Sequence, residues 1–208
     1  PGAAQPAYPS KPIRFILPFP PGSGTDIGAR IVAQQITAQT GQPVVVDNRA
    51  GGNGVIAAQA VAQAAPDGYT VFVTTMTTQS VNPFLYKKLP YDPVADFIPV
   101  AMITKSAMVL VVRNTEDQPK SVAELTARMQ AAGSKLSFAS GNTSSLVAGK
   151  TYSNAVSSPA LHVPYKGNPQ AVTDLMAGAV DFMFSDLTVA NPLVQQGRLR
   201  GLGVTGPT

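Results

Sequence analysis

The chain has 208 residues, enough for one or two domains with cores of useful size. Charged residues make up only 12% of it, and the net charge of +4 includes no run of Lys or Arg, so we expect no nucleic-acid partner. The chain has no cysteine, which excludes disulfides, zinc–thiolate sites and cysteine nucleophiles. No apolar run approaches the roughly 18–20 residues that a membrane-spanning helix needs.

The first hundred residues alternate short apolar runs with amphipathic stretches. Strands are predicted over residues 13–17, 44–46 and 69–74. A helix with Ile27, Ile31 and Ile36 on one face is expected to end at Gly41, and an alanine-rich helix is expected over residues 55–65. The order β-α-β-α-β favours a parallel sheet with covering helices. Residues 82–99 contain four prolines and are predicted to be irregular.

The second half of the chain repeats this alternation. Strands are predicted over residues 108–112, 136–139, 161–163, 181–184 and 199–204. Ser121 and Glu124 have the spacing of a capping box, which predicts a helix from there to about residue 132. A further helix is expected after the polar loop 140–144. Another begins at Asn168-Pro169, because proline is favoured in the first turn of a helix.

These elements predict an α/β protein with two lobes, each a mostly parallel sheet flanked by helices. Lobe 1 is assigned to residues 1–103 and lobe 2 to residues 104–199, with residues 200–208 returning to lobe 1. The hinge is expected near residues 103–105 and 199–202. Loops from two such lobes meet at a cleft, which is a common place for a ligand, so we expect the ligand cleft there.

Two strand-to-helix loops are the first candidates for a binding site. They contain Pro21, Gly22, Ser23, Gly24, Thr25 and Asp26 in one case, and Ser140, Gly141, Asn142, Thr143 and Ser144 in the other. A helix N-terminus exposes unpaired N–H groups and a partial positive charge, and small residues let an anion approach them. The alternative for both loops is ordinary helix capping, for example by Thr25 or Asp26.

A third polar cluster includes Thr77, Thr78 and Gln79. It follows a predicted strand, at the end where ligands bind to open α/β sheets. The alternative is an ordinary loop rich in hydroxyl groups.

Groups that could carry catalysis are scarce. His162 is the only histidine, and its apolar neighbours favour a packed structural role over that of a base. Asp186 lies at a strand end without a sequence-adjacent partner that would raise its pKa. We find no catalytic motif, cofactor motif or cluster of metal ligands, so we expect no enzyme. Gly22, Gly24 and Asp47 leave a nucleotide-dependent α/β enzyme as the alternative, although the glycine spacing does not fit the dinucleotide-binding motif.

Several segments occur together in the order found in one known family. They are FPPGSGTDIGAR (19–30), GQPVVVDNRAGGNG (41–54), APDGYT (65–70), NPFLY (82–86), LPYDP (89–93), SGN (140–142), HVPYKG (162–167) and GRLR (197–200). The chain resembles the Bug/TctC family, the extracytoplasmic receptors of tripartite tricarboxylate transporters. The resemblance covers nearly the whole chain.

The resemblance implies a two-lobed periplasmic binding protein that closes around a small organic carboxylate, such as a di- or tricarboxylate or an aromatic acid. The carboxylate is expected at the loops 22–26 and 140–144, with Tyr165 and Asp186 completing the predicted ligand-binding set. The implied partners are the membrane subunits of the transporter, and the full-length receptor is expected to be a monomer. Residues 1–9 fit the start of a chain after signal-peptide cleavage. A sensor of carboxylates has the same binding chemistry and remains an alternative.

Two departures from the family pattern affect these expectations. Where many relatives have Asp-Asn, this chain has Ser185-Asp186. An acid at the first of these two positions can contact a ligand amine, so the shift argues against an amino-acid ligand. Relatives also continue beyond the position of Thr208. Without that continuation we expect part of the apolar surface of lobe 1 to be uncovered, with lower stability or self-association as the consequence.

Overall fold

The computed structural model describes residues 8–105, 107–132 and 135–206, and it contains two compact units. The first unit takes residues up to Pro21 together with Thr25–Thr104. The second takes Gly22–Gly24 and the residues from Lys105 onward. Most of the predicted start of the chain, residues 1–7, lies outside the described residues, as do the last two residues.

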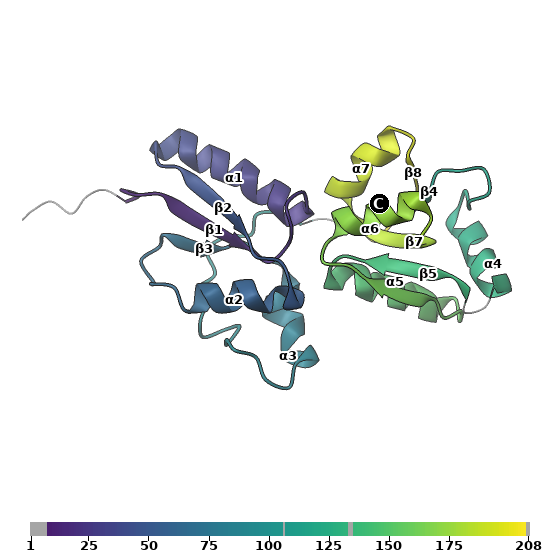
Figure 1. The fold of residues 1–208 in the computed structure, drawn as a ribbon, viewed down its shortest axis with the longest axis horizontal. Coiled ribbons are helices and arrows are strands. Elements are labelled where there is room, and N and C mark those ends of the chain that lie inside the picture. Colours follow the sequence, from purple (N-terminus) through teal and green to yellow (C-terminus); the bar gives the residue numbers. More distant parts are fainter. Residues whose placement is uncertain (1–7, 106, 133–134, 207–208) are drawn as a thin grey trace, which may run out of the picture. The chain divides into compact units, whose positions relative to one another are not determined.

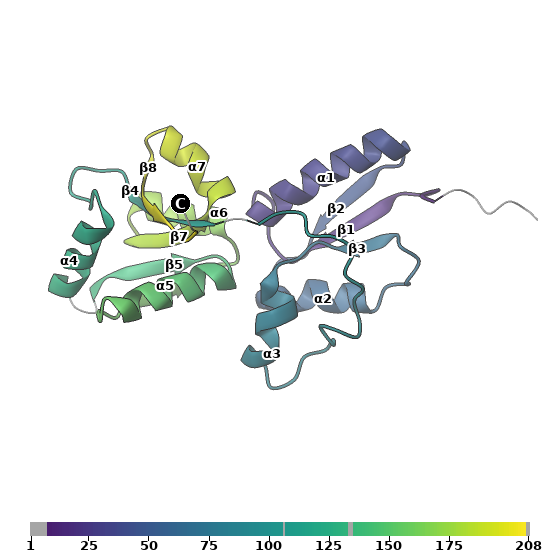
Figure 2. The same cartoon turned by 180° about the vertical axis from the view of Figure 1, so that it is seen from behind.

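The first unit contains a three-stranded parallel sheet in the order β2-β1-β3 (Figure 1). Its strands are β1 (Ile13–Leu17), β2 (Val44–Asn48) and β3 (Thr70–Phe72). Helices α1 (Gly24–Thr40) and α2 (Val55–Ala62) cover opposite faces of the sheet, with the one-turn η1 (Gly52–Gly54) before α2 (Figures 1 and 2). This arrangement follows from right-handed crossovers, because β2 and β3 flank β1 on opposite sides. The predicted β-α-β-α-β order is confirmed.

The core of the first unit contains alternate residues of β1. Ile13, Phe15 and Leu17 are buried with Ala29 and Ala33 of α1, as expected for residues on one face of a strand. The small alanine side chains let the helix pack closely against the sheet.

The segment predicted to be irregular begins with more structure than expected. The π-helix η2 (Thr77–Val81) leads into the short helix α3 (Asn82–Leu85), and no helix or strand follows among the described residues until β4. Between α3 and β4 the chain exposes five large apolar side chains, those of Val94, Ile98, Val100, Met102 and Ile103.

The second unit contains a five-stranded sheet in the order β6-β5-β7-β4-β8. Strands β5 (Ser137–Ser140), β6 (Leu161–Pro164) and β7 (Phe182–Asp186) run parallel to one another. Strand β4 (Met108–Arg113) runs antiparallel to both β7 and β8 (Leu199–Val204). The expectation of a mostly parallel sheet therefore holds for the β6-β5-β7 half only.

Both faces of this sheet are buried, and neighbouring residues of a strand enter different cores. Leu110, Phe182 and Phe138 pack on the face of α4 (Val122–Ala132) and α5 (Thr143–Ala155). Val111, Met183 and Ala139 pack on the face of α6 (Asn168–Ala177) and α7 (Leu187–Gln195). The near-continuous apolar runs in the sequence are the consequence of this burial on two sides.

The helix start predicted at Ser121 is confirmed, but one of the two capping hydrogen bonds has a different donor from the one expected. The Ser121 hydroxyl accepts a hydrogen bond from the Glu124 N–H at 3.1 Å, as in a capping box. The Glu124 carboxylate accepts its bond from the N–H of Lys120 at 2.8 Å, one residue before the expected donor.

The prediction that residues 200–208 return to the first lobe is wrong for the residues described. Strand β8 pairs with β4 from Arg113↔Leu199 to Val109↔Val204, inside the sheet of the second unit. The Thr205 N–H extends this pairing to the Met108 carbonyl at 2.9 Å. Residues 199–202 are held by backbone hydrogen bonds within one sheet, so the hinge predicted there is also wrong.

Candidate functional site

The parallel half of the second sheet brings three helix N-termini to one edge. Strands β5, β6 and β7 run in the same direction, so their carboxyl ends share an edge, and α5, α6 and α7 begin there. Each helix start offers N–H groups that have no partner within the helix. We call this region the donor edge and define it by Gly24, Gly141, Asn142, Asn168 and Asp186.

Asn142 performs two tasks at the start of α5. It is the N-cap residue, and its side-chain oxygen accepts a hydrogen bond from the Ser145 N–H at 2.8 Å. Its side-chain NH₂ group lies 3.3 and 3.4 Å from the two carboxylate oxygens of Asp186. This loop therefore caps α5, although the cap is an asparagine and not the expected serine or threonine, and capping leaves the amide group facing Asp186.

Gly141 and Asn168 join two of the helix starts. The Gly141 N–H donates to the Asn168 side-chain oxygen at 3.1 Å, and the Asn168 side chain is 0% exposed. A Cβ atom on Gly141 would lie 2.1 Å from the Asn168 nitrogen, so only glycine fits this approach. Sequence reasoning treated Asn168 as a helix start and missed this contact.

The Asn168 NH₂ group is buried and has no hydrogen-bond partner of good geometry within the described chain. It nevertheless lies close enough to the Asp186 carboxylate to lower the pKa of that group. The Asn168 NH₂ group is thus a buried donor beside Asp186 whose capacity for hydrogen bonds is not fully used.

Asp186 is the half-buried centre of the donor edge. It precedes α7 but does not cap that helix with its side chain. Burial raises its pKa, while hydrogen bonds from Asn142, from Asn168 and from the Gly24 N–H act in the opposite direction. All three donors are neutral. This environment could not be predicted from the sequence, because the donors come from positions far from Asp186 in the chain.

The first predicted loop is divided between the two units. Gly22, Ser23 and Gly24 cluster with the second unit, and Gly22 has a φ of 78°, which favours glycine. Pro21 and Thr25 belong to the first unit.

Asp26 lies inside the first turn of α1 and is therefore not its N-cap. Its buried carboxylate accepts from the Arg30 Nε at 3.1 and 3.0 Å and from the Asn48 side chain at 3.0 Å. These bonds tie α1 to β2, and an acid in the first turn also interacts favourably with the helix dipole. The structure thus gives Asp26 a structural role, and its contact with a ligand stays a prediction.

The third predicted cluster lies in the first unit, where Thr77 and Thr78 are buried and Gln79 is half-buried. Thr77 and Thr78 are 2% and 0% exposed, and the Thr78 hydroxyl bonds that of Thr74 at 2.6 Å. The Thr78 carbonyl accepts from the Tyr91 hydroxyl, and the Gln79 side chain donates to the Pro93 carbonyl. These bonds fix η2 against the irregular segment that follows it, and a role in ligand binding stays a prediction.

Ser140, His162 and Tyr165 all have partners of their own. The Ser140 hydroxyl bonds the His162 Nε2 at 2.7 Å, and the imidazole packs against Phe138. Burial lowers the pKa of His162, and Lys150 lowers it further, which fits a packed structural histidine. The Tyr165 hydroxyl donates to Asp174 at 2.7 Å, and burial with this bond raises the pKa of Tyr165 to about 12. Thr143 and Ser144 are the first residues of α5.

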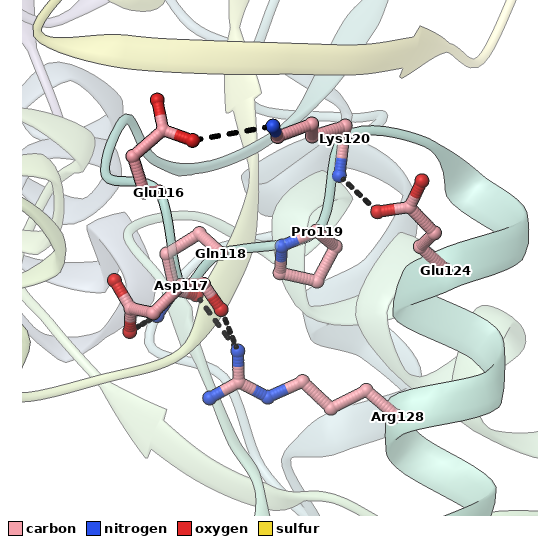
Figure 3. Close-up of a pocket in the computed structure, with 7 residues that line it drawn as sticks. All are labelled: Glu116, Asp117, Gln118, Pro119, Lys120, Glu124 and Arg128. Carbon is pink, nitrogen blue, oxygen red and sulfur yellow. Dashed lines mark hydrogen bonds and ion pairs between the residues drawn. The ribbon is translucent and has the colours of Figure 1, made fainter.

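A separate surface pocket lies beside the N-terminus of α4 (Figure 3). Its charged side chains satisfy one another: Lys120 pairs with Glu116 at 3.2 Å, and Arg128 donates to the Asp117 carbonyl at 3.0 Å. Groups that are already paired gain little from a ligand, so we place no site there. Residues 8–105, 107–132 and 135–206 contain no cluster of three metal-ligating side chains, and no helix in them is long and apolar enough to cross a membrane.

Comparison with known proteins identifies the family. Residues 28–208 match the family model described as the tripartite tricarboxylate transporter family receptor, TctC. The chain belongs to this family. The predicted family membership and the two-lobed α/β fold are thereby confirmed.

Among curated relatives, this chain is 39% identical over 201 residues to the UPF0065 protein in the tcbD-tcbE intergenic region of Pseudomonas sp. strain P51. The alignment covers 96% of this chain but only 59% of that protein. The chain thus spans about three fifths of the length of this relative.

Two solved structures show the same fold with ligands. The first is Rpa4515 of R. palustris with adipate, which is 30% identical with a TM-score of 0.93; the match covers 97% of this chain and 68% of that one. The second is MatC of Rhodopseudomonas palustris with bound malate, which is 28% identical with a TM-score of 0.86; the match covers 96% and 68%. Both ligands, as named, are small dicarboxylates.

Proposed function

We propose that this receptor binds a small organic carboxylate and delivers it to the membrane subunits of a tripartite tricarboxylate transporter. The observation that carries the proposal is the donor edge, where the starts of α5, α6 and α7 present neutral donors in a member of this receptor family. The adipate and malate held by structurally similar proteins support a dicarboxylate as the ligand class.

The chemistry of the donor edge suits reversible binding of an anion. Backbone N–H groups at a helix start carry partial positive charge and hold a carboxylate without a permanent counter-ion. Binding by neutral donors avoids the large desolvation cost of burying an arginine or lysine. We assign the carboxylate contacts to the loops Gly22–Gly24 and Ser140–Ser144, and we propose no catalytic step.

The family also supports a location and a partner. We infer that the receptor works in the periplasm, where it captures its ligand and presents it to the transporter. Closure of the two lobes on the ligand would change the surface that the transporter meets, which is a common device of binding proteins.

A thermal-shift screen tests this function. The panel contains adipate, malate, citrate and benzoate, with glutamate, NAD and ATP as controls. A ligand at a hundredfold excess over its dissociation constant stabilises the native state by about 2.7 kcal/mol. For a protein of this size that corresponds to a rise in Tm of about 5–10 °C.

We expect a rise in Tm with at least one carboxylate and none with NAD or ATP. A rise with a nucleotide alone would contradict the proposal and favour a nucleotide-dependent enzyme.

A further inference from the structure

The donors that the proposed function offers to a ligand already face a carboxylate of the protein itself. Asn142 lies 3.3 and 3.4 Å from the Asp186 oxygens, and the Gly24 N–H and the Asn168 side chain act on the same group. Asn168 is fully buried, and its NH₂ group has no partner of good geometry within the described chain. The donor edge therefore holds more donors than Asp186 satisfies.

In the described part of the chain, no cation is among the groups that act on Asp186. The groups that act on it are amides and a backbone N–H. The charged or titratable side chains on the elements around it are Asp26 and Arg30 of α1, which pair with each other, Arg113 of β4, Lys150 and Tyr152 of α5, His162 of β6, Tyr165 and Lys166 of the loop after β6, and Asp174 of α6. None of these nine is among the groups that shift its pKa.

Other side chains of this set are engaged elsewhere. His162 bonds Ser140, and Asp174 accepts from Tyr165. Arg113 pairs with Asp117 at 3.6 Å. It is the last residue of β4, whereas Asp186 pairs with the first residue of that strand, Met108. An anionic ligand at the donor edge thus meets one uncompensated negative charge.

Two carboxylates that share neutral donors in a partly buried place do not both stay ionised, because their repulsion favours binding of a proton. We propose that the donor edge binds a dicarboxylate together with one proton, and that Asp186 is the residue that takes up this proton. The proton comes from solvent and goes to a carboxylate oxygen of Asp186, which then donates a hydrogen bond to the ligand. Asp186 is thereby a specificity-determining residue that selects ligands by charge. This inference rests on the proposed carboxylate-binding function.

Isothermal titration of adipate and malate measures the proton directly. Titrations at pH 7.5 in HEPES and in Tris, which differ in ionisation enthalpy, give the number of protons bound with each ligand. We expect about one proton for the wild type, and a dissociation constant that falls up to about tenfold for each unit that the pH is lowered from 8 to 6. Free carboxylates are ionised in this range, and the lowered pKa of His162 keeps that residue neutral over most of it.

The variant Asp186→Asn keeps the shape and one acceptor oxygen but removes the charge. We expect it to bind adipate at least about tenfold more tightly at pH 7.5, with no proton uptake and little pH dependence. Glu116→Gln is the matched control, because it removes one negative charge from the exposed loop of the same unit, and its affinity should equal that of the wild type.

Wild-type binding without proton uptake would overturn the inference while leaving the proposed function in place, and that measurement does not depend on the variant's folding. If neither protein binds any carboxylate at pH 6 to 8, the inference and the proposed function both fail.

Discussion

Replacing Gly141 with alanine is expected to lower the free energy of unfolding by about 2–4 kcal/mol and to abolish carboxylate binding. The added Cβ would lie 2.1 Å from the Asn168 nitrogen and 2.2 Å from the Gly167 carbonyl carbon. Both are backbone atoms, so the clash cannot be relieved by turning a side chain. Moving the two chain segments apart would also break the 3.1 Å bond from Gly141 to Asn168, which sets the geometry of the donor edge.

Urea denaturation and titration with adipate measure the two effects of this change. Gly201→Ala is the matched control, because its new Cβ would find its nearest neighbour, a methyl group of Val109, at 3.5 Å, an ordinary contact. It should change the free energy of unfolding by less than about 1 kcal/mol. A Gly141→Ala protein as stable as the wild type, with unchanged affinity, would show that the donor edge does not need this close approach.

Replacing Phe182 with alanine should cost about 3–5 kcal/mol of stability, because it opens a cavity in the core beneath the donor edge. The Phe182 side chain is 0% exposed, and its ring lies 5.8 Å from that of Phe138 and 5.9 Å from that of Tyr152. Since Phe182 begins β7, which ends at Asp186, loosening of this strand should also weaken ligand binding.

Denaturation followed by hydrogen exchange of the β4 and β7 amides measures this loss. Phe84→Ala is the control, because this ring is 89% exposed and its removal should change stability by no more than about 0.5 kcal/mol. Equal effects of the two substitutions would argue against the core described for the second unit.

Much of the fold could be predicted because burial leaves a local pattern in the sequence. Residues 13–17, which are apolar except for Arg14, form β1 over the predicted range. The apolar run that begins at residue 108 forms β4. The helix start at residue 122 follows from local capping, in which the partners lie within four residues of each other. The start at residue 168 follows from the proline in the first turn and has no side-chain cap.

Pairing between distant segments leaves no such pattern. Residues 199–204 carry no local signal of the sheet that they join, because their partner β4 lies far earlier in the chain, at residues 108–113. For the same reason the sequence did not predict that β4 runs antiparallel to its neighbours.

The candidate site was predictable only in part. The loop at Asn142 could be predicted as a candidate, because small polar residues between a strand and a helix are typical of anion sites. The role of Asn168 and the environment of Asp186 were missed, because both depend on contacts across 27 and 44 residues of chain. The hydroxyl-rich cluster at Thr77 was found by composition alone, and composition does not distinguish a buried π-helix from a binding loop.

The most direct test of the account is an amide chemical-shift map of the receptor during titration with adipate. We expect the largest shifts at Gly141–Ser145, Gly24 and Asp186, with saturation at one ligand per chain. Shifts confined to other parts of the chain, such as the pocket between Glu116 and Arg128, would contradict the claim that the donor edge holds the carboxylate.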